Sequence, residues 1–90
     1  MTIFIDGPEW PGHGRYWSHL ISDSSFNELQ EFADQLGIPR GAFDGDHYDI
    51  PEERFAQCLE AGAEQCSSRE LVTKLYAAGL RRRKRSRLAR

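Results

Sequence analysis

The sequence has few cysteines and no long hydrophobic segment. Cys58 and Cys66 are its two cysteines and do not form a CxxC pair, so neither a disulfide framework nor a zinc knuckle is indicated. No apolar run approaches the roughly 18–20 residues that span a bilayer, and no basic-then-apolar signal segment opens the chain. These absences predict a cytoplasmic protein.

The composition predicts one small globular domain. The 90 residues are 39% hydrophobic, 29% charged and 11% aromatic. So many aromatic side chains argue against a disordered chain. A chain of this length buries only about 60–65% of the surface that it exposes when unfolded, so we expect a small core.

The net charge of −2 conceals an uneven distribution. Residues 81–90 contain seven of the twelve Lys and Arg and no acid, whereas residues 1–80 contain five basic and all fourteen acidic residues, a balance of −9. We therefore predict a single domain over residues 1–80 and a basic, disordered tail over residues 81–90. Such a tail either solubilises the chain or folds back on its acidic body. Alternatively, it binds nucleic acid or, as the weakest alternative, an anionic membrane surface. The candidates for nucleic-acid binding are Arg81, Arg82, Arg83, Lys84 and Arg85.

The first 22 residues predict a strand, a loop and a short helix. Residues 2–5 (TIFI) are apolar on both faces, as in a buried strand. Residues 7–14 (GPEWPGHG) contain three Gly and two Pro, which favour an ordered loop. Residues 15–22 (RYWSHLIS) are assigned to two turns of helix.

Three longer helices follow from capping signals and apolar spacing. Residues 25–36 and 68–78 each begin at a Ser-x-x-Glu capping box and end before a glycine. The helix between them has Pro51 in its first turn and ends at Gly62.

Two further extended segments, over residues 42–48 and 63–66, complete an alternation of strands and helices. This order predicts an α/β domain of two or three layers, with a short, mostly parallel sheet of about three strands and three to four helices.

Histidines and aspartates fall where such a sheet would bind a ligand, beyond the carboxyl ends of its strands. Asp6 ends the first strand, and His47 and Asp49 stand two residues apart in an extended segment, so both point to one face. His19 and Asp23 stand four apart and would share a helix face. The candidate catalytic residues are Asp6, His13, His19, His47 and Asp49.

Imidazole nitrogen and carboxylate oxygen are ligands for zinc, manganese or iron. The candidate ligands for a divalent zinc or manganese ion are His13, His19, His47 and Asp49. The same groups can act as general acid and base without a metal. Because no HExxH, HxH or CxxC spacing is present, purely structural roles stay open, with Asp49 as a helix cap.

Aromatic residues are dense in the first 20 positions. Trp10, Tyr16 and Trp17 either form core and lid or offer a stacking surface for a base, with Arg15 as an anion clamp beside them. The GHG sequence around His13 allows a close backbone approach to a ligand. The candidate ligand-binding residues are Trp10, Arg15, Trp17, Asp23 and Tyr48.

The stretches HGRYWSHLISD, ELQEFADQLGIP, DHYDIPEERF and GAEQCSSRELV resemble the bacterial family called domain of unknown function 4031, over residues 2–79. The basic tail is not part of the matching pattern, and the resemblance implies no established activity. Some longer chains similar to this one continue into a phosphohydrolase-like domain of the HD type, which implies nucleotide or phosphate chemistry. The family motif maps onto Asp6, Trp10, Pro11, His13, Gly14, Trp17, Ser18, His19, Leu20, Asp23, His47, Tyr48 and Asp49.

Two functions are compatible with the sequence. The favoured one is a His/Asp site that binds or processes a phosphate-containing small molecule or a nucleic-acid end, with or without a divalent metal. The alternative is a non-catalytic module that binds nucleic acid through the basic tail or docks a protein partner. We expect no membrane partner.

Overall fold

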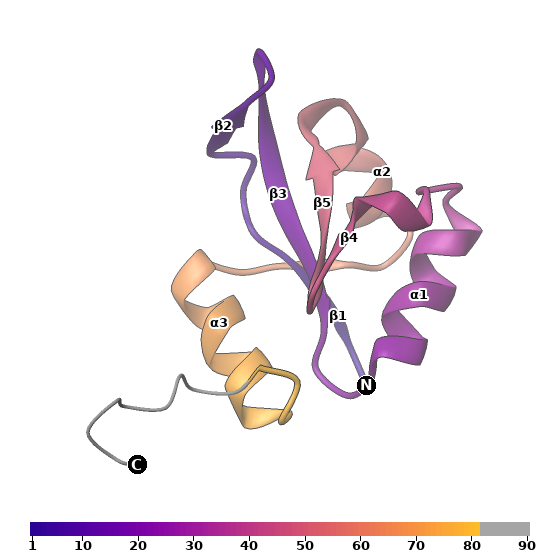
Figure 1. Cartoon of the computed structure of the whole chain (residues 1–90), viewed down its shortest axis with the longest axis vertical. Coiled ribbons are helices and arrows are strands. Elements are labelled where there is room, and N and C mark those ends of the chain that lie inside the picture. The colour runs from indigo at the N-terminus through magenta and orange to yellow at the C-terminus, as the bar shows by residue number, and fades with distance from the viewer. Residues whose placement is uncertain (82–90) are drawn as a thin grey trace.

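The computed structural model describes residues 1–81 and contains three α-helices, two 3₁₀ turns and six strands (Figure 1). None of the described helices is both long and apolar enough to cross a membrane. In chain order, the elements are β1 (Ile3–Ile5), β2 (Trp10–Gly12), β3 (Arg15–Ser22), α1 (Phe26–Gln35), η1 (Arg40–Ala42), β4 (Phe43–Asp44), β5 (His47–Pro51), η2 (Glu52–Arg54), α2 (Phe55–Glu60), β6 (Glu64–Gln65) and α3 (Ser68–Ala77).

The strands form one mixed sheet in the order β4-β5-β3-β1-β6, and β2 pairs with β3. Only the β1–β6 pair is parallel among the pairings of residues 1–81. The α/β class is confirmed, but the prediction of about three mostly parallel strands is wrong. The physical reason is that two-residue turns join β2 to β3 and β4 to β5, and such short connections permit only antiparallel pairing.

The hairpin of β2 and β3 replaces the predicted loop and the predicted helix over residues 15–22. Its turn is His13-Gly14, and both residues have positive φ, 50° and 76°, as a type I′ turn requires. Gly14 thus supplies one of the two residues with positive φ that this turn needs. Aromatic and branched side chains favour the extended backbone, where their pairing across the sheet stabilises them. Trp10 lies directly opposite Trp17 in the register.

The capping signals predict α1 and α3 correctly. Ser67 and Glu70 form both hydrogen bonds of the capping box of α3, whereas at α1 only the Ser25 side chain accepts from a backbone N–H, that of Glu28. The middle helix is shorter than predicted. Pro51 is the last residue of β5, and α2 begins only after the 3₁₀ turn η2.

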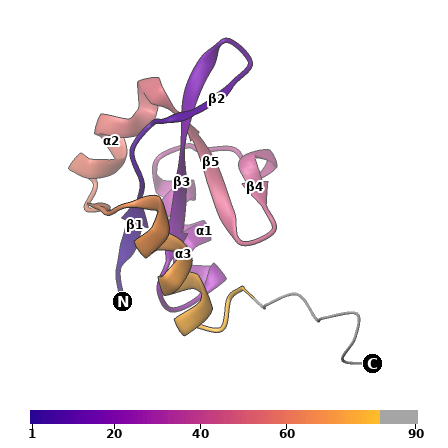
Figure 2. The ribbon, with the colours of Figure 1, turned by 90° about the vertical axis from the view of Figure 1, so that its left-hand side faces the viewer.

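Two apolar clusters lie on opposite faces of the sheet. One, between the sheet and helices α1 and α2, includes Leu20, Tyr48 and Cys58, all fully buried. The other lies under α3, where Leu71 and Leu75 cover Ile21. Figure 2 shows α3 in front of β1 and the lower part of β3, while no helix lies in front of the upper part of the sheet. We call the part of the α3 face that lies outside the apolar cluster under α3 the open half. Strand register and alternation place the side chains of Trp10, Trp17, His19, His47 and Asp49 there.

Candidate functional site

Asp6, which directly follows β1, is the buried anchor of the site. Its side chain is 1% exposed and accepts four hydrogen bonds. The backbone N–H of His19 donates to Oδ1 at 2.6 Å, while His19 Nδ1, Trp10 Nε1 and Ser68 Oγ lie 2.8, 3.2 and 2.7 Å from Oδ2. Burial alone would raise the pKa of Asp6, but the bonds from His19 and Ser68 outweigh it and leave the pKa below its usual value. Asp6 is therefore a carboxylate that fixes three side chains.

His19 lies in the middle of β3, directly opposite Asp49 of β5. The hydrogen bond to Asp6 raises the pKa of His19 against the opposing effect of burial. Because Nδ1 is occupied by Asp6, Nε2 is the ring nitrogen left for another partner. The ring meets those of Trp10 and His47 edge-on, with centroids 5.1 and 5.0 Å apart.

His47, at the start of β5, has a carboxylate at each ring nitrogen. Nδ1 lies 2.8 Å from Asp46 Oδ1, and Nε2 lies 3.1 Å from Asp49 Oδ1. Asp46 is itself held by Arg81, whose Nε and Nη2 donate to its two oxygens at 2.6 and 2.9 Å. Burial alone would raise the pKa of Asp46. The hydrogen bonds from Arg81 and His47 outweigh this effect and leave the pKa below its usual value.

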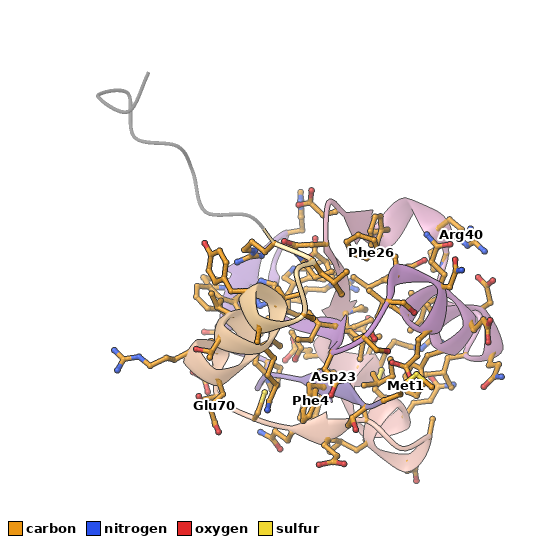
Figure 3. All side chains as sticks on the ribbon, turned by 90° about the horizontal axis from the view of Figure 1, so that it is seen from below. Met1, Phe4, Asp23, Phe26, Arg40 and Glu70 are labelled. Atoms are coloured by element: carbon orange, nitrogen blue, oxygen red, sulfur yellow. The ribbon has the colours of Figure 1, made fainter. Side chains whose placement is uncertain are left out.

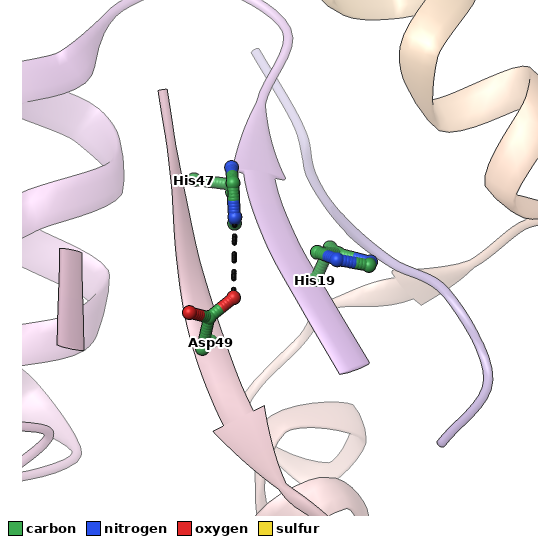
Figure 4. A group of neighbouring side chains, drawn as sticks. All are labelled: His19, His47 and Asp49. Carbon is green, nitrogen blue, oxygen red and sulfur yellow. Dashed lines mark ion pairs between the residues drawn. The ribbon is translucent and has the colours of Figure 1, made fainter. Parts of the chain in front are cut away.

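His19, His47 and Asp49 form a cluster that can hold a metal ion (Figure 4). One ligand atom from each lies within 4.8 Å of the others. The 3.1 Å between His47 Nε2 and Asp49 Oδ1 is close to the roughly 3.4 Å expected between two ligands of a tetrahedral ion with bonds of about 2.1 Å. With His19, the set consists of two imidazoles and one carboxylate. The prediction that His47 and Asp49 point to one face of an extended segment is confirmed.

Two hollows flank this cluster. A cavity of about 220 Å³ lies toward α3 and is lined by Asp6, His19, His47, Ser68 and Arg81, among others. A wider groove of about 470 Å³ lies on the other side. It is lined by Trp10, Pro11, Gly12, His13, Trp17, His19, Gly41, Ala42 and Asp49. Trp10 and His19 line both the cavity and the groove, so the cluster can be reached from two sides.

Two other predicted residues lie on the hairpin, farther from the cluster. His13 occupies the turn, where its ring meets that of Trp17 edge-on at 6.4 Å, so it lines the groove but is not one of the three clustered ligands. Arg15 is exposed, forms an ion pair with Glu53 at 2.7 Å, and lies 5.9 Å from the centre of the Trp17 ring. It does not line either hollow beside the cluster.

Two predicted ligand-binding residues lie away from the site. Tyr48 is fully buried in the core on the α1 face, because alternate residues of β5 point to opposite faces. Asp23 follows β3 and accepts a hydrogen bond from the backbone N–H of Thr2 at 2.8 Å, close to the labelled N-terminal residues in Figure 3. The helix face that Asp23 was expected to share with His19 does not exist, since residues 15–22 are a strand.

The basic tail was predicted to begin at Arg81. Arg81 instead pairs with Asp46 and lines the smaller cavity. The other nucleic-acid candidates, Arg82, Arg83, Lys84 and Arg85, lie outside the described residues.

Sequence reasoning missed three side chains of the site: Asp46, Ser68 and Arg81. Asp46 could have been found from its neighbours in the sequence. Gly45-Asp46 forms a turn between two strands and directly precedes His47, which brings the Asp46 carboxylate beside the His47 ring. Ser68 carried no such signal, since it lies 62 positions from its partner Asp6. Arg81 begins a run of basic residues and was therefore predicted to belong to the tail.

The family model for protein of unknown function DUF4031 matches residues 3–78. The chain therefore belongs to this family, as the resemblance in its sequence indicated. No curated protein and no solved structure matches it.

Proposed function

We propose that this member of the DUF4031 family binds a divalent transition-metal ion through His19, His47 and Asp49, and that the ion in turn holds a phosphate-containing ligand. Two imidazoles and a carboxylate suit zinc, manganese or iron better than magnesium or calcium, which prefer oxygen ligands alone.

The observation that supports this proposal is that both proposed histidine ligands, His19 and His47, have a carboxylate at Nδ1. Asp6 occupies Nδ1 of His19 and Asp46 occupies Nδ1 of His47, both at 2.8 Å. In metal sites such partners fix the tautomer and the ring orientation of the ligand, and they make Nε2 the metal-binding nitrogen. Both carboxylates are held in turn, Asp6 by Ser68 and Trp10 and Asp46 by Arg81.

The number of ligands favours a site that takes a further molecule. Structural zinc sites use four protein ligands, whereas sites that bind substrate use three and keep a position open. An acidic surface repels a phosphate group, and a bound divalent cation would reverse the sign of the local charge.

The test is binding of ribose 5-phosphate to the full chain, with and without one equivalent of Zn²⁺, by isothermal titration calorimetry. We expect affinity only in the presence of zinc. Asp49→Asn should abolish the zinc-dependent binding, because it removes the anionic ligand with little change of shape. Glu60→Gln is the control, since Glu60 is an exposed carboxylate of α2 that lines neither hollow beside the cluster.

Equal binding with and without zinc, or unchanged zinc-dependent binding in Asp49→Asn, would contradict the proposal. Metal-independent binding of an oligonucleotide that disappears when residues 82–90 are removed would instead favour the nucleic-acid module.

A further inference from the structure

The groove on the hairpin side of the cluster has walls of unusual composition for a polar site. The β2–β3 hairpin contributes Trp10, His13 and Trp17 on one side, and η1 contributes Gly41 and Ala42 on the other. The groove also reaches His19 and Asp49, two of the three proposed metal ligands. Its volume of about 470 Å³ lies within the range of about 300–1,000 Å³ for small-molecule sites.

Trp10 is both exposed and held in place. Its side chain is 45% exposed, yet its indole Nε1 donates to the buried carboxylate of Asp6 at 3.2 Å. A core tryptophan would be covered, and a free surface tryptophan would have no such anchor. The arrangement leaves an aromatic face available at a fixed position next to the His19 ring.

Trp17 is oriented in a similar way. It lies opposite Trp10 in the hairpin register, and its Nε1 donates to the carbonyl oxygen of Gly12 at 2.8 Å. Both indole N–H groups are therefore satisfied within the protein, so a ligand would meet the aromatic rings and not their polar atoms.

The residues that η1 contributes to the groove are small. A Cβ atom added at Gly41 would meet no atom within 4 Å, and Ala42 presents only a methyl group. Neither residue therefore places a bulky side chain in the groove.

We propose that this groove takes the base of a nucleoside phosphate, stacked on Trp10, while the phosphate is held at the metal site. The inference rests on the proposed function and adds the substrate class. Bases stack on tryptophan because both offer a large π-face, and the Trp10 and His19 rings lie only 5.1 Å apart, so one small molecule can reach both positions.

The experiment compares AMP with ribose 5-phosphate on the zinc-loaded full chain, by calorimetry. The two ligands share sugar and phosphate and differ in the base. We expect AMP to bind on the order of tenfold more tightly. Trp10→Ala should remove most of this preference, and Trp10→Phe, which keeps an aromatic face but loses the bond to Asp6, should retain much of it.

Tyr16→Ala is the matched control. Tyr16 is a similarly exposed aromatic residue of the same hairpin, at 50%, but it does not line the groove, so the preference for AMP should be unchanged. Equal affinity of the wild type for AMP and ribose 5-phosphate, or a preference that persists in Trp10→Ala, would overturn the inference while leaving the metal site intact. Failure of both ligands to bind the zinc-loaded chain would refute the proposed function instead.

Discussion

The α3 face of the sheet has two halves that are stabilised in different ways. Under α3, Phe4 and Ile21 pack against Leu71 and Leu75 in an apolar cluster. In the open half, polar and aromatic side chains are positioned by hydrogen bonds to two carboxylates, Asp6 and Asp46. Ser68, the first residue of α3, donates to Asp6 and joins the two halves.

The difference shows how a small domain can keep a rigid site without burying it. Apolar side chains gain stability from removal of surface from water, which requires a covering helix. Charged hydrogen bonds fix side chains that stay partly exposed, such as His19 at 26% and His47 at 15%. The open half thus gains order from its anchoring carboxylates, and the covered half supplies stability.

The largest expected effect is in the covered half. Leu75 is fully buried, so Leu75→Ala should lower the free energy of unfolding by about 3 kcal/mol, through lost burial and the resulting cavity. Urea denaturation measures this value. A loss below about 1 kcal/mol would show that α3 contributes little to the stability of the domain.

The next effect is at the anchor of the open half. In Asp6→Asn, the amide nitrogen cannot accept the hydrogen bonds that His19, Trp10 and Ser68 make to Oδ2. The free energy of unfolding should therefore fall by about 2 kcal/mol. Zinc affinity should fall about 10- to 100-fold, as it does when the partner of a ligating histidine is removed. Denaturation and zinc titration check the two effects, and the control Glu60→Gln should change neither. Unaltered zinc affinity in Asp6→Asn would show that Asp6 does not position a metal ligand.

The smallest effect is at the junction of the two halves. Ser68→Ala removes one hydrogen bond to a charged partner and should cost about 1 kcal/mol of stability. The capping box of Ser67 and Glu70 is untouched by this change, so α3 itself should keep its helical circular-dichroism signal. A loss equal to that of Leu75→Ala would mean that Ser68 supports the helix as well as the junction.

Much of the helical structure and part of the site could be predicted from local sequence signals. The start of α3 depends on a Ser-x-x-Glu box, and α1 ends before Gly37, whose φ is +70°. The shared face of His47 and Asp49 follows from the two-residue period of a strand. These features depend on residues close together in the chain.

Features that depend on distant partners were not predictable. Residues 15–22 suit both a short helix and a strand, and the decision comes from the backbone bonds that β3 makes to β1, β2 and β5. Once β3 is a strand, Trp17 and His19 share a face by alternation, while Asp23 lies beyond the strand end. In the same way, Arg81 looks like part of a charged tail until Asp46, 35 positions earlier, is placed beside it.

The metal site is tested most directly by a calorimetric titration of the metal-free full chain with Zn²⁺, beside His47→Gln and Asp49→Asn. We expect one zinc ion per wild-type chain and loss of that binding in both variants, each of which should remain folded because these side chains are partly exposed. No zinc binding by the wild type, or the same affinity in all three proteins, would contradict a metal site at His19, His47 and Asp49.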